Sequence, residues 1–247
     1  MITHSNIQVT VMNNATKRSQ GFTLVELMVA LVIAGIALSA IYALFISQSK
    51  TYTIQKQVVE LQQNLRVSML LMEREIRQTG YNPGGLTESA AGSDGIDNNC
   101  DGTTDEADNI GTLLVDESEA IGFQVALANR VSFSMDKNGD GTTCGGKENI
   151  TYALNGTTLE RNGTPRFANI EVLNFVYLDE NAAVTTSIGN IRSVQIAVIG
   201  RTNDEDTSYN NTKSYVNLQG VEILAAQNDG FRRRLLTSQV DCRNLID

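Results

Sequence analysis

Carboxylate and amide side chains recur at regular intervals between residues 94 and 108. Counted from Asp97, oxygen-bearing side chains stand at positions one, three, five, nine and twelve, with glycine at position six. A hard cation such as Ca²⁺ takes about six to eight oxygen ligands, and short acids around a sharp glycine turn can supply them from one loop. This spacing predicts a calcium site. Its ligands would be Asp97, Asn99, Asp101, the backbone carbonyl of Thr103, Asp105 and Asp108.

This loop resembles the EF-hand loop, and its beginning also resembles the Asp-Gly-rich calcium loops of extracellular repeat proteins. Asp108 departs from the usual glutamate at position twelve, and its shorter side chain weakens the case for bidentate ligation. A second, weaker candidate lies at residues 136–148, with Lys147 at position twelve and Glu148 one residue late. Its first three ligands would be Asp136, Asn138 and Asp140.

The surrounding composition leaves two interpretations of these loops. From Gln78 to Asn129 the chain has ten acidic residues and no basic one. Such a cluster repels itself, so it should be either solvated or neutralised by a bound cation. Calcium binding and a solvated acidic loop both remain open from the sequence.

A long apolar run, from Phe22 to Ile46, follows a polar segment that ends in basic residues. Glu26 is the only charged residue among its 25 positions. A run of at least about 18 apolar residues indicates a membrane span. An ionised side chain at the centre of a bilayer costs about 2.5–3.5 kcal/mol on insertion scales, so Glu26 should have a partner.

The sequence Gly-Phe-Thr-Leu-Val-Glu at residues 21–26, after Lys-Arg-Ser-Gln at 17–20, resembles the amino terminus of type IV pilins and type II pseudopilins. In that family a prepilin peptidase cuts after the glycine and the new amino terminus is methylated. The carboxylate four residues on then pairs with a neighbouring subunit's amino terminus. The resemblance implies cleavage between Gly21 and Phe22 and an assembly role for Glu26. Residues 1–21 would be the leader, and a start at Met12 would shorten that leader to ten residues.

Charge and composition exclude several classes of function. The net charge is −9, and removal of residues 1–21, which contain two basic residues and no acid, leaves −11. An acidic chain lacks the surplus of basic residues that nonspecific nucleic-acid binding needs. The same cleavage removes His4, the only histidine, so the mature chain has no Ser-His or Cys-His pair and no histidine-based zinc site. We therefore expect a protein that is not an enzyme.

Three cysteines lie beyond the apolar run. The basic residues before the run predict that its amino-terminal end stays cytoplasmic, which places the cysteines in an oxidising compartment. One disulfide and one remaining thiol is the natural arrangement. We favour a disulfide between Cys100 and Cys144, because both lie in loop-like acidic segments, and Cys144 with Cys242 is the alternative.

The pattern after the leader predicts an α+β fold. Residues 22–79 should form one helix, with a transmembrane or assembly half at 22–46 and an amphipathic half at 47–79. The apolar stripe of the second half should pack on a globular domain at 80–247, a coiled-coil partner being the alternative. The stripe consists of Ile54, Val58, Leu61, Leu65, Met69, Met72 and Ile76.

Short segments rich in β-branched and aromatic residues predict an antiparallel sheet on this stripe. Asn155-Gly156 predicts a two-residue type I′ hairpin, and Gly80 to Gly85 should end the helix. A last strand could begin near Phe231. The other expected strands are residues 120–126, 130–136, 149–154, 157–161, 172–178, 191–202 and 213–224.

The segments 175–178, 191–196 and 231–245 are similar to PilW-type minor pilins and the related J-type minor pseudopilins. This resemblance implies a structural subunit in the priming complex or tip of a type IV pilus, with roles in adhesion or motility. Other minor pilins, the major pilin, the pilus assembly platform and prepilin peptidase would be its partners, and the inner membrane would hold it before assembly. A type II secretion pseudopilin is the alternative within the family.

Two readings from other classes remain open: a calcium-stabilised adhesin-like module and a DNA-uptake subunit. The uptake reading would use the basic cluster Arg232 to Arg234. Pairing of these arginines with acids of this domain or of a neighbouring subunit is the favoured interpretation of the cluster.

Overall fold

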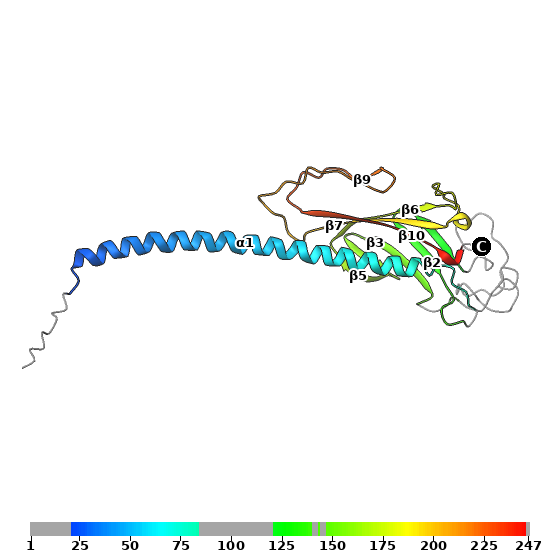
Figure 1. The fold of residues 1–247 in the computed structure, drawn as a ribbon, viewed down its shortest axis with the longest axis horizontal. Helices are drawn as coiled ribbons and strands as arrows, with labels where there is room; N and C mark the ends of the chain where they lie inside the picture. The colour runs from blue at the N-terminus through cyan, green and yellow to red at the C-terminus, as the bar shows by residue number, and fades with distance from the viewer. Residues whose placement is uncertain (1–20, 84–120, 140–142, 144–146, 246–247) are drawn as a thin grey trace, which may run out of the picture. The chain divides into compact units, whose positions relative to one another are not determined.

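The computed structural model describes residues 21–83, 121–139, 143 and 147–245 of the chain. The chain divides into two compact units, Met1–Thr51 and Tyr52–Asp247, with the boundary inside one long helix. This helix, α1, runs from Leu24 to Ile76 over 53 residues (Figure 1). It corresponds to the predicted helix apart from its last turn, where residues 77–80 form a hydrogen-bonded turn.

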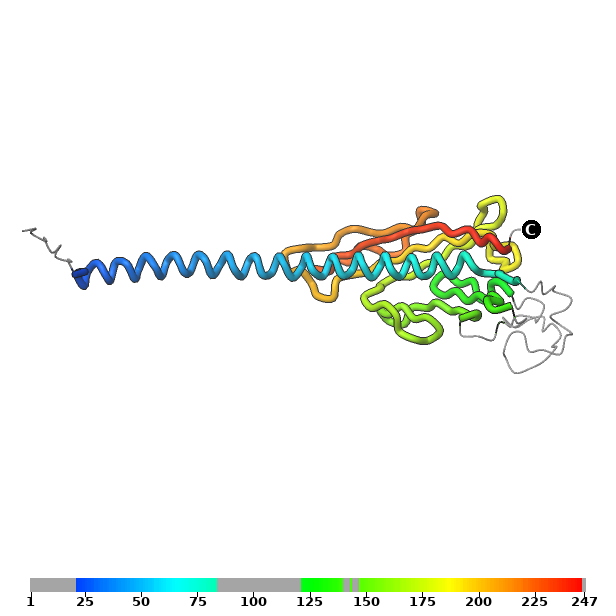
Figure 2. The backbone as a smooth tube through the Cα atoms, turned by 60° about the horizontal axis from the view of Figure 1, so that its bottom comes forward, coloured from blue at the N-terminus to red at the C-terminus, as the bar shows by residue number. Residues whose placement is uncertain are grey.

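The second unit contains two main antiparallel sheets, which flank the carboxyl-terminal half of α1 (Figure 2). The first is a meander in the order β1-β2-β3-β4-β5, and the second has the order β10-β7-β6. The first sheet is formed by β1 (Phe123–Leu127), β2 (Arg130–Ser134), β3 (Asn149–Asn155), β4 (Thr158–Arg161) and β5 (Thr164–Ala168). The second is formed by β6 (Ile170–Leu178), β7 (Ser193–Arg201) and β10 (Arg233–Asp241).

The smaller elements among the described residues of the unit are one hairpin and two 3₁₀ turns. The short strands β8 (Tyr215–Val216) and β9 (Glu222–Leu224) form a separate hairpin between β7 and β10. Two 3₁₀ turns, η2 (Ile188–Asn190) and η3 (Arg243–Leu245), follow β6 and β10. The hairpin is fastened to the three-stranded sheet by amide side chains, since Asn217 Nδ2 donates to Asn174 Oδ1 at 3.1 Å and Gln219 Nε2 donates to Gln195 Oε1 at 2.9 Å.

The predicted helix stripe forms one wall of the hydrophobic core, which confirms packing of the helix on the sheets. Five of its seven residues, from Leu61 to Ile76, are buried, whereas Ile54 and Val58 are partly buried. The five buried residues pack in one cluster with residues from both sheets, including Phe133, Tyr152 and Val198. Burial of this apolar face stabilises the unit by about 25 cal/mol per Å² of apolar surface removed from water.

Gly200 explains how closely the helix approaches β7. A Cβ atom at this position would lie 2.5 Å from Leu61 Cδ1 and 3.0 Å from the carbonyl oxygen of Asn169. The missing side chain therefore lets Leu61 and Leu65 lie directly against the strand.

Several predicted strand boundaries were wrong. Residues 213–224, predicted as one strand, contain the β8–β9 hairpin, in which Asn217 caps the turn by accepting from the backbone N–H groups of Gln219 and Val221. The last strand, β10, begins at Arg233, two residues after Phe231, and runs to Asp241. The sequence analysis did not predict β5. This strand contains Pro165 and Arg166 and its side chains are mostly exposed, so it lacks the apolar pattern of a buried strand.

The type I′ turn was also assigned to the wrong Asn-Gly pair. Asn155 pairs with Thr158, so Gly156 and Thr157 form the turn, and only Gly156 has a positive φ, at 59°. Asn162 and Gly163, between β4 and β5, have φ values of 51° and 68°, as a type I′ turn requires. The Asn-Gly dipeptide that favours a type I′ turn occurs at both positions. The register of the paired strands determines which dipeptide occupies the two turn positions.

Candidate functional site

The predicted cleavage and assembly residues lie at the start of α1. Thr23 is the N-cap residue and Glu26 is the third residue of the helix. The Glu26 carboxylate accepts hydrogen bonds from the Thr23 backbone N–H at 2.9 Å and from Thr23 Oγ1 at 2.8 Å, and the Glu26 N–H donates to Thr23 Oγ1 at 3.3 Å. This reciprocal arrangement is a capping box, which satisfies two of the free N–H groups at a helix start. Within one chain, Glu26 therefore already has a partner.

From Phe22 to Ile46 the apolar side chains are exposed on all sides. By length and composition α1 could cross a membrane, with a mean hydropathy of 2.6 over its most apolar 18-residue window. None of that window is buried in the described structure. These side chains require a lipid or protein environment, as expected for a membrane anchor that later enters an assembly.

The first predicted calcium loop, including all six ligands from Asp97 to Asp108, lies outside the described residues, as does Asp140 of the second loop. The described part of the second loop is a tight turn held by two buried carboxylates. Asp136 Oδ1 accepts from the Gly139 N–H at 2.6 Å, and Glu148 Oε1 accepts from the N–H groups of Lys137 and Asn138, both at 3.2 Å.

Strand pairing brings Glu148 to this turn. Ser134 of β2 pairs with Asn149 of β3, and the Met135 N–H donates to the Glu148 carbonyl at 2.9 Å. Glu148 lies one residue past position twelve of the predicted loop, and strand pairing brings its carboxylate to the backbone N–H groups of the turn. Within the described ranges, no group of three or more His, Cys, Asp and Glu side chains could hold a metal ion.

The favoured disulfide, Cys100 with Cys144, lies outside the described residues and stays a prediction. Cys242 is fully buried in the core and forms no disulfide with the described residues, and its N–H donates to the Arg192 carbonyl at 2.9 Å. Cys144 lies outside the described residues, so its alternative pairing with Cys242 also stays a prediction. Burial raises the pKa of the Cys242 thiol to about 12, so this thiol stays protonated and unreactive at neutral pH.

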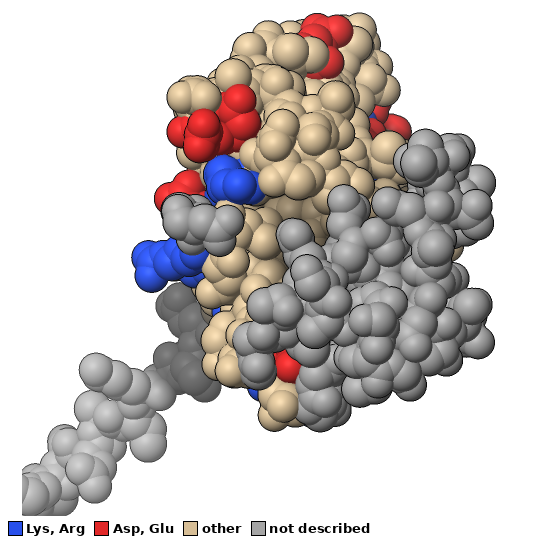
Figure 3. Space-filling model, turned by 90° about the vertical axis from the view of Figure 1, so that its right-hand side faces the viewer, with Lys and Arg blue, Asp and Glu red and all other residues tan. Residues whose placement is uncertain are grey.

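Two of the three clustered arginines form ion pairs within the domain. Arg232 pairs with Asp206 at 2.7 Å and lies over the Tyr209 ring. Hydrogen bonds from Ser208 and Arg232 hold the pKa of the Asp206 carboxyl well below its usual range. On the face in Figure 3, the described basic side chains lie near acidic ones and form no continuous basic patch.

Arg233 has the most buried of these side chains. It donates to both Glu171 carboxylate oxygens, with Nη2 to Oε1 at 3.0 Å, and to both Asp229 oxygens, with Nη2 to Oδ2 at 2.7 Å. These hydrogen bonds lower the pKa of Asp229. Arg234, by contrast, is exposed and makes no ion pair with the described residues.

A buried polar cluster, not anticipated from the sequence, connects α1 to the five-stranded sheet. The Glu75 carboxylate accepts from the Tyr152 hydroxyl at 2.5 Å and from Arg161 Nε at 2.9 Å. Burial, together with this carboxylate, raises the pKa of Tyr152. The signal in the sequence was a glutamate one residue before Ile76 in the stripe, but its partners lie more than 70 residues away.

Two protein families match this chain, one at its amino terminus and one over the domain that follows. Residues 16–42 match the prokaryotic N-terminal methylation motif, which covers the predicted cleavage site and Glu26. Residues 54–218, more than half of the chain, match the model of prepilin peptidase-dependent protein B. The chain belongs to the prepilin peptidase-dependent protein B family. This prepilin therefore depends on prepilin peptidase for processing and assembles with other pilins.

The remaining comparisons concern solved structures and curated proteins. A type IV-like pilin from Thermus thermophilus has 16% sequence identity over 76% of this prepilin and 98% of its own chain, with a TM-score of 0.45. A search of curated proteins gave no match. The methylation motif and the apolar helix of this prepilin indicate membrane anchoring before pilus assembly.

Proposed function

We propose that this prepilin is a minor pilin, a structural subunit that acts in the priming complex or at the tip of a type IV pilus. The observation that carries the proposal is a carboxylate, Glu26, at the start of a fully exposed apolar helix and directly after the cleavage motif. Pilin families are generally structural, and we propose the same for this chain. The second unit would face the periplasm before assembly.

Glu26 would change partners on assembly. Among the described residues of the single chain, its carboxylate accepts hydrogen bonds from Thr23. A methylated amino terminus from a neighbouring subunit would give it a cationic partner in an apolar surrounding, where a charged group without a partner is strongly penalised. This exchange would link entry into the filament to correct register.

Glu26→Ala should leave leader cleavage intact and reduce incorporation into sheared filaments by at least about tenfold, because the buried amino terminus of the neighbour loses its counter-charge. Processing is measured as the mass of the mature chain, and incorporation by quantifying the chain in the sheared fraction. Thr23→Ala is the matched control, since it removes the local cap but keeps the carboxylate. Incorporation of Glu26→Ala at the level of the unsubstituted chain would contradict the proposal.

A type II secretion pseudopilin remains the alternative. The two roles differ in the subunits that co-purify with the chain after crosslinking. Recovery of type IV pilus subunits supports the minor pilin, and recovery of secretion-system pseudopilins supports the alternative.

We also propose that calcium stabilises the acidic loops of the domain. Two buried carboxylates, Asp136 and Glu148, gather at the turn of residues 136–139 by accepting its backbone N–H groups, and oxygen-rich side chains around a tight turn suit a hard cation. Chelator should lower the melting temperature of the purified chain by several degrees and added calcium should restore it, because a ligand that binds only the folded state stabilises that state. Magnesium serves as the control cation. An unchanged melting temperature with chelator would show that the loops are solvated instead.

A further inference from the structure

Most strand edges of the two main sheets carry features that block pairing with another chain. β5 contains Pro165 and Arg166 and has a register shift against β4. β1 is five residues long and is also irregular, and β6 has a register shift and donates from Phe175 N–H to the Ala128 carbonyl. Prolines, charges, short strands and bulges are common protections against edge-to-edge association.

β10 lacks these protections. It is the outer strand of the three-stranded sheet, nine residues long, and pairs with β7 at nine consecutive positions with no register shift. The segment from Leu235 to Val240 contains no proline and no charged residue.

The outward backbone groups of β10 can be identified from the two ends of its ladder. Thr202 N–H donates to the Arg232 carbonyl, and Cys242 N–H donates to the Arg192 carbonyl, both at 2.9 Å. In an antiparallel ladder such pairs alternate, so even-numbered residues bond to β7 and odd-numbered ones point their N–H and C=O groups away from it. The outward-pointing residues are Arg233, Leu235, Thr237, Gln239 and Asp241.

Four of these five outward residues are at least partly exposed. Gln239 and Asp241 are exposed, Leu235 and Thr237 are partly exposed, and Arg233 is buried. Among the described residues, no backbone hydrogen bond joins them to another element.

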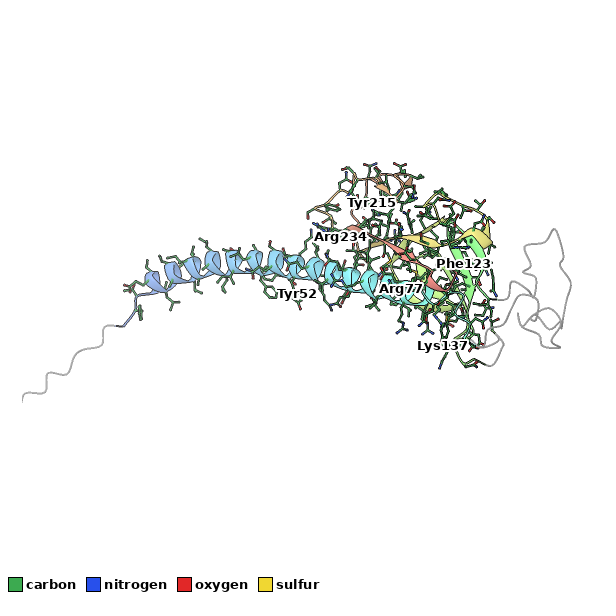
Figure 4. The ribbon with its side chains drawn as sticks, turned by 45° about the vertical axis from the view of Figure 1, so that its right-hand side comes forward. Tyr52, Arg77, Phe123, Lys137, Tyr215 and Arg234 are labelled. Atoms are coloured by element: carbon green, nitrogen blue, oxygen red, sulfur yellow. The ribbon has the colours of Figure 1, made fainter. Side chains whose placement is uncertain are left out.

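The charges that flank this edge also lack partners within the described residues. Arg234 is exposed at one end, unlike Arg232 and Arg233, whose charges are neutralised by the domain itself. Figure 4 shows Arg234 toward the Tyr52 end of the unit, away from Phe123. At the other end of the strand, Asp241 is exposed and forms no ion pair with the described residues.

We infer that β10 pairs, backbone to backbone, with an extended segment of a different subunit of the filament, an inference that rests on the proposed function. The partner segment is uncharged opposite Leu235 to Val240. It places a carboxylate beside Arg234 and a basic side chain beside Asp241, about 24 Å apart at about 3.4 Å per residue. Backbone hydrogen bonds supply the affinity, and the two end charges select the partner and its register.

The experiment uses the full-length chain in cells that assemble the filament. A photocrosslinking amino acid replaces exposed Gln239, and mass spectrometry identifies the crosslinked segment. We expect a crosslink to an extended segment of another filament subunit. Thr237→Pro should reduce that crosslink by about tenfold, the loss expected for one or two hydrogen bonds plus a steric block. It removes an outward N–H and leaves the ladder with β7 intact.

Thr237→Val is the matched control, since it keeps the N–H and the branched shape and should retain the crosslink. Leader cleavage and the melting temperature of Thr237→Pro report whether the chain still folds. If that variant fails to fold, Arg234→Glu and Asp241→Lys test the same edge through its charges, and each should weaken the crosslink.

Three results would overturn the inference: an undiminished crosslink in Thr237→Pro, crosslinks only between identical copies, or no crosslink from a chain that enters filaments normally. In the last case the proposed function stands and only the edge inference fails. Absence of the unsubstituted chain from sheared filaments would instead overturn the proposed function, and the edge inference with it.

Discussion

Glu75→Ala should lower the free energy of unfolding by about 3–5 kcal/mol, the usual cost of leaving one partner of a buried ion pair uncompensated. The side chains of Glu75 and Arg161 are only 11% and 14% exposed, and the Tyr152 hydroxyl also donates to this carboxylate. Loss of the carboxylate would leave Arg161 without its counter-charge and the Tyr152 hydroxyl without its acceptor. Denaturant unfolding of the purified full-length chain in detergent measures the change.

Two further variants show whether the cost comes from the broken pair. Glu60→Gln, on the same helix, removes an exposed pair with Lys56 and should change stability by less than about 1 kcal/mol. The double variant Glu75→Leu/Arg161→Leu should be less destabilised than the sum of the two single variants, because no charge is left unpaired. A Glu75→Ala loss as small as that of Glu60→Gln would show that the cluster does not connect the helix to the sheet.

Arg233→Met should destabilise the unit by a similar amount, about 3–5 kcal/mol. Its side chain is 1% exposed, and its removal would leave the carboxylates of Glu171 and Asp229 close together without their main partner. The adjacent variant Arg234→Met is the matched control and should be nearly neutral, since that side chain is exposed. Equal stabilities of the two variants would contradict the assignment of Arg233 as the buried partner.

The same variant should change the acid sensitivity of the protein. Arg233 lowers the pKa of Asp229 in the folded state, so this contribution is fully present above the unfolded pKa of about 4 and is lost as pH falls through the folded pKa. Arg233→Met removes that contribution. Its unfolding free energy should therefore fall less steeply with acid than that of the unsubstituted chain, as unfolding curves between about pH 5 and pH 3 would show.

Local patterns in the sequence predicted much of the fold. The apolar stripe predicted the buried face of α1, and strand propensity located most of the sheet. The predictions that were wrong concern strands and turns whose positions depend on pairing between different segments of the chain. β5 is an exposed edge strand with little local signal, and the choice between the Asn155 and Asn162 turns depended on register.

The sequence by itself determined how this protein is processed and anchored. Gly21, Phe22 and Glu26 lie in one continuous segment, so their spacing along the chain carries the signal. Only the tertiary structure decided how the charges of the domain are paired. Glu75 pairs with Arg161 and Arg233 pairs with Glu171, whereas Arg234 is exposed and has no ion pair among the described residues. Strand pairing and helix packing produce these differences, because they bring together residues from distant parts of the chain.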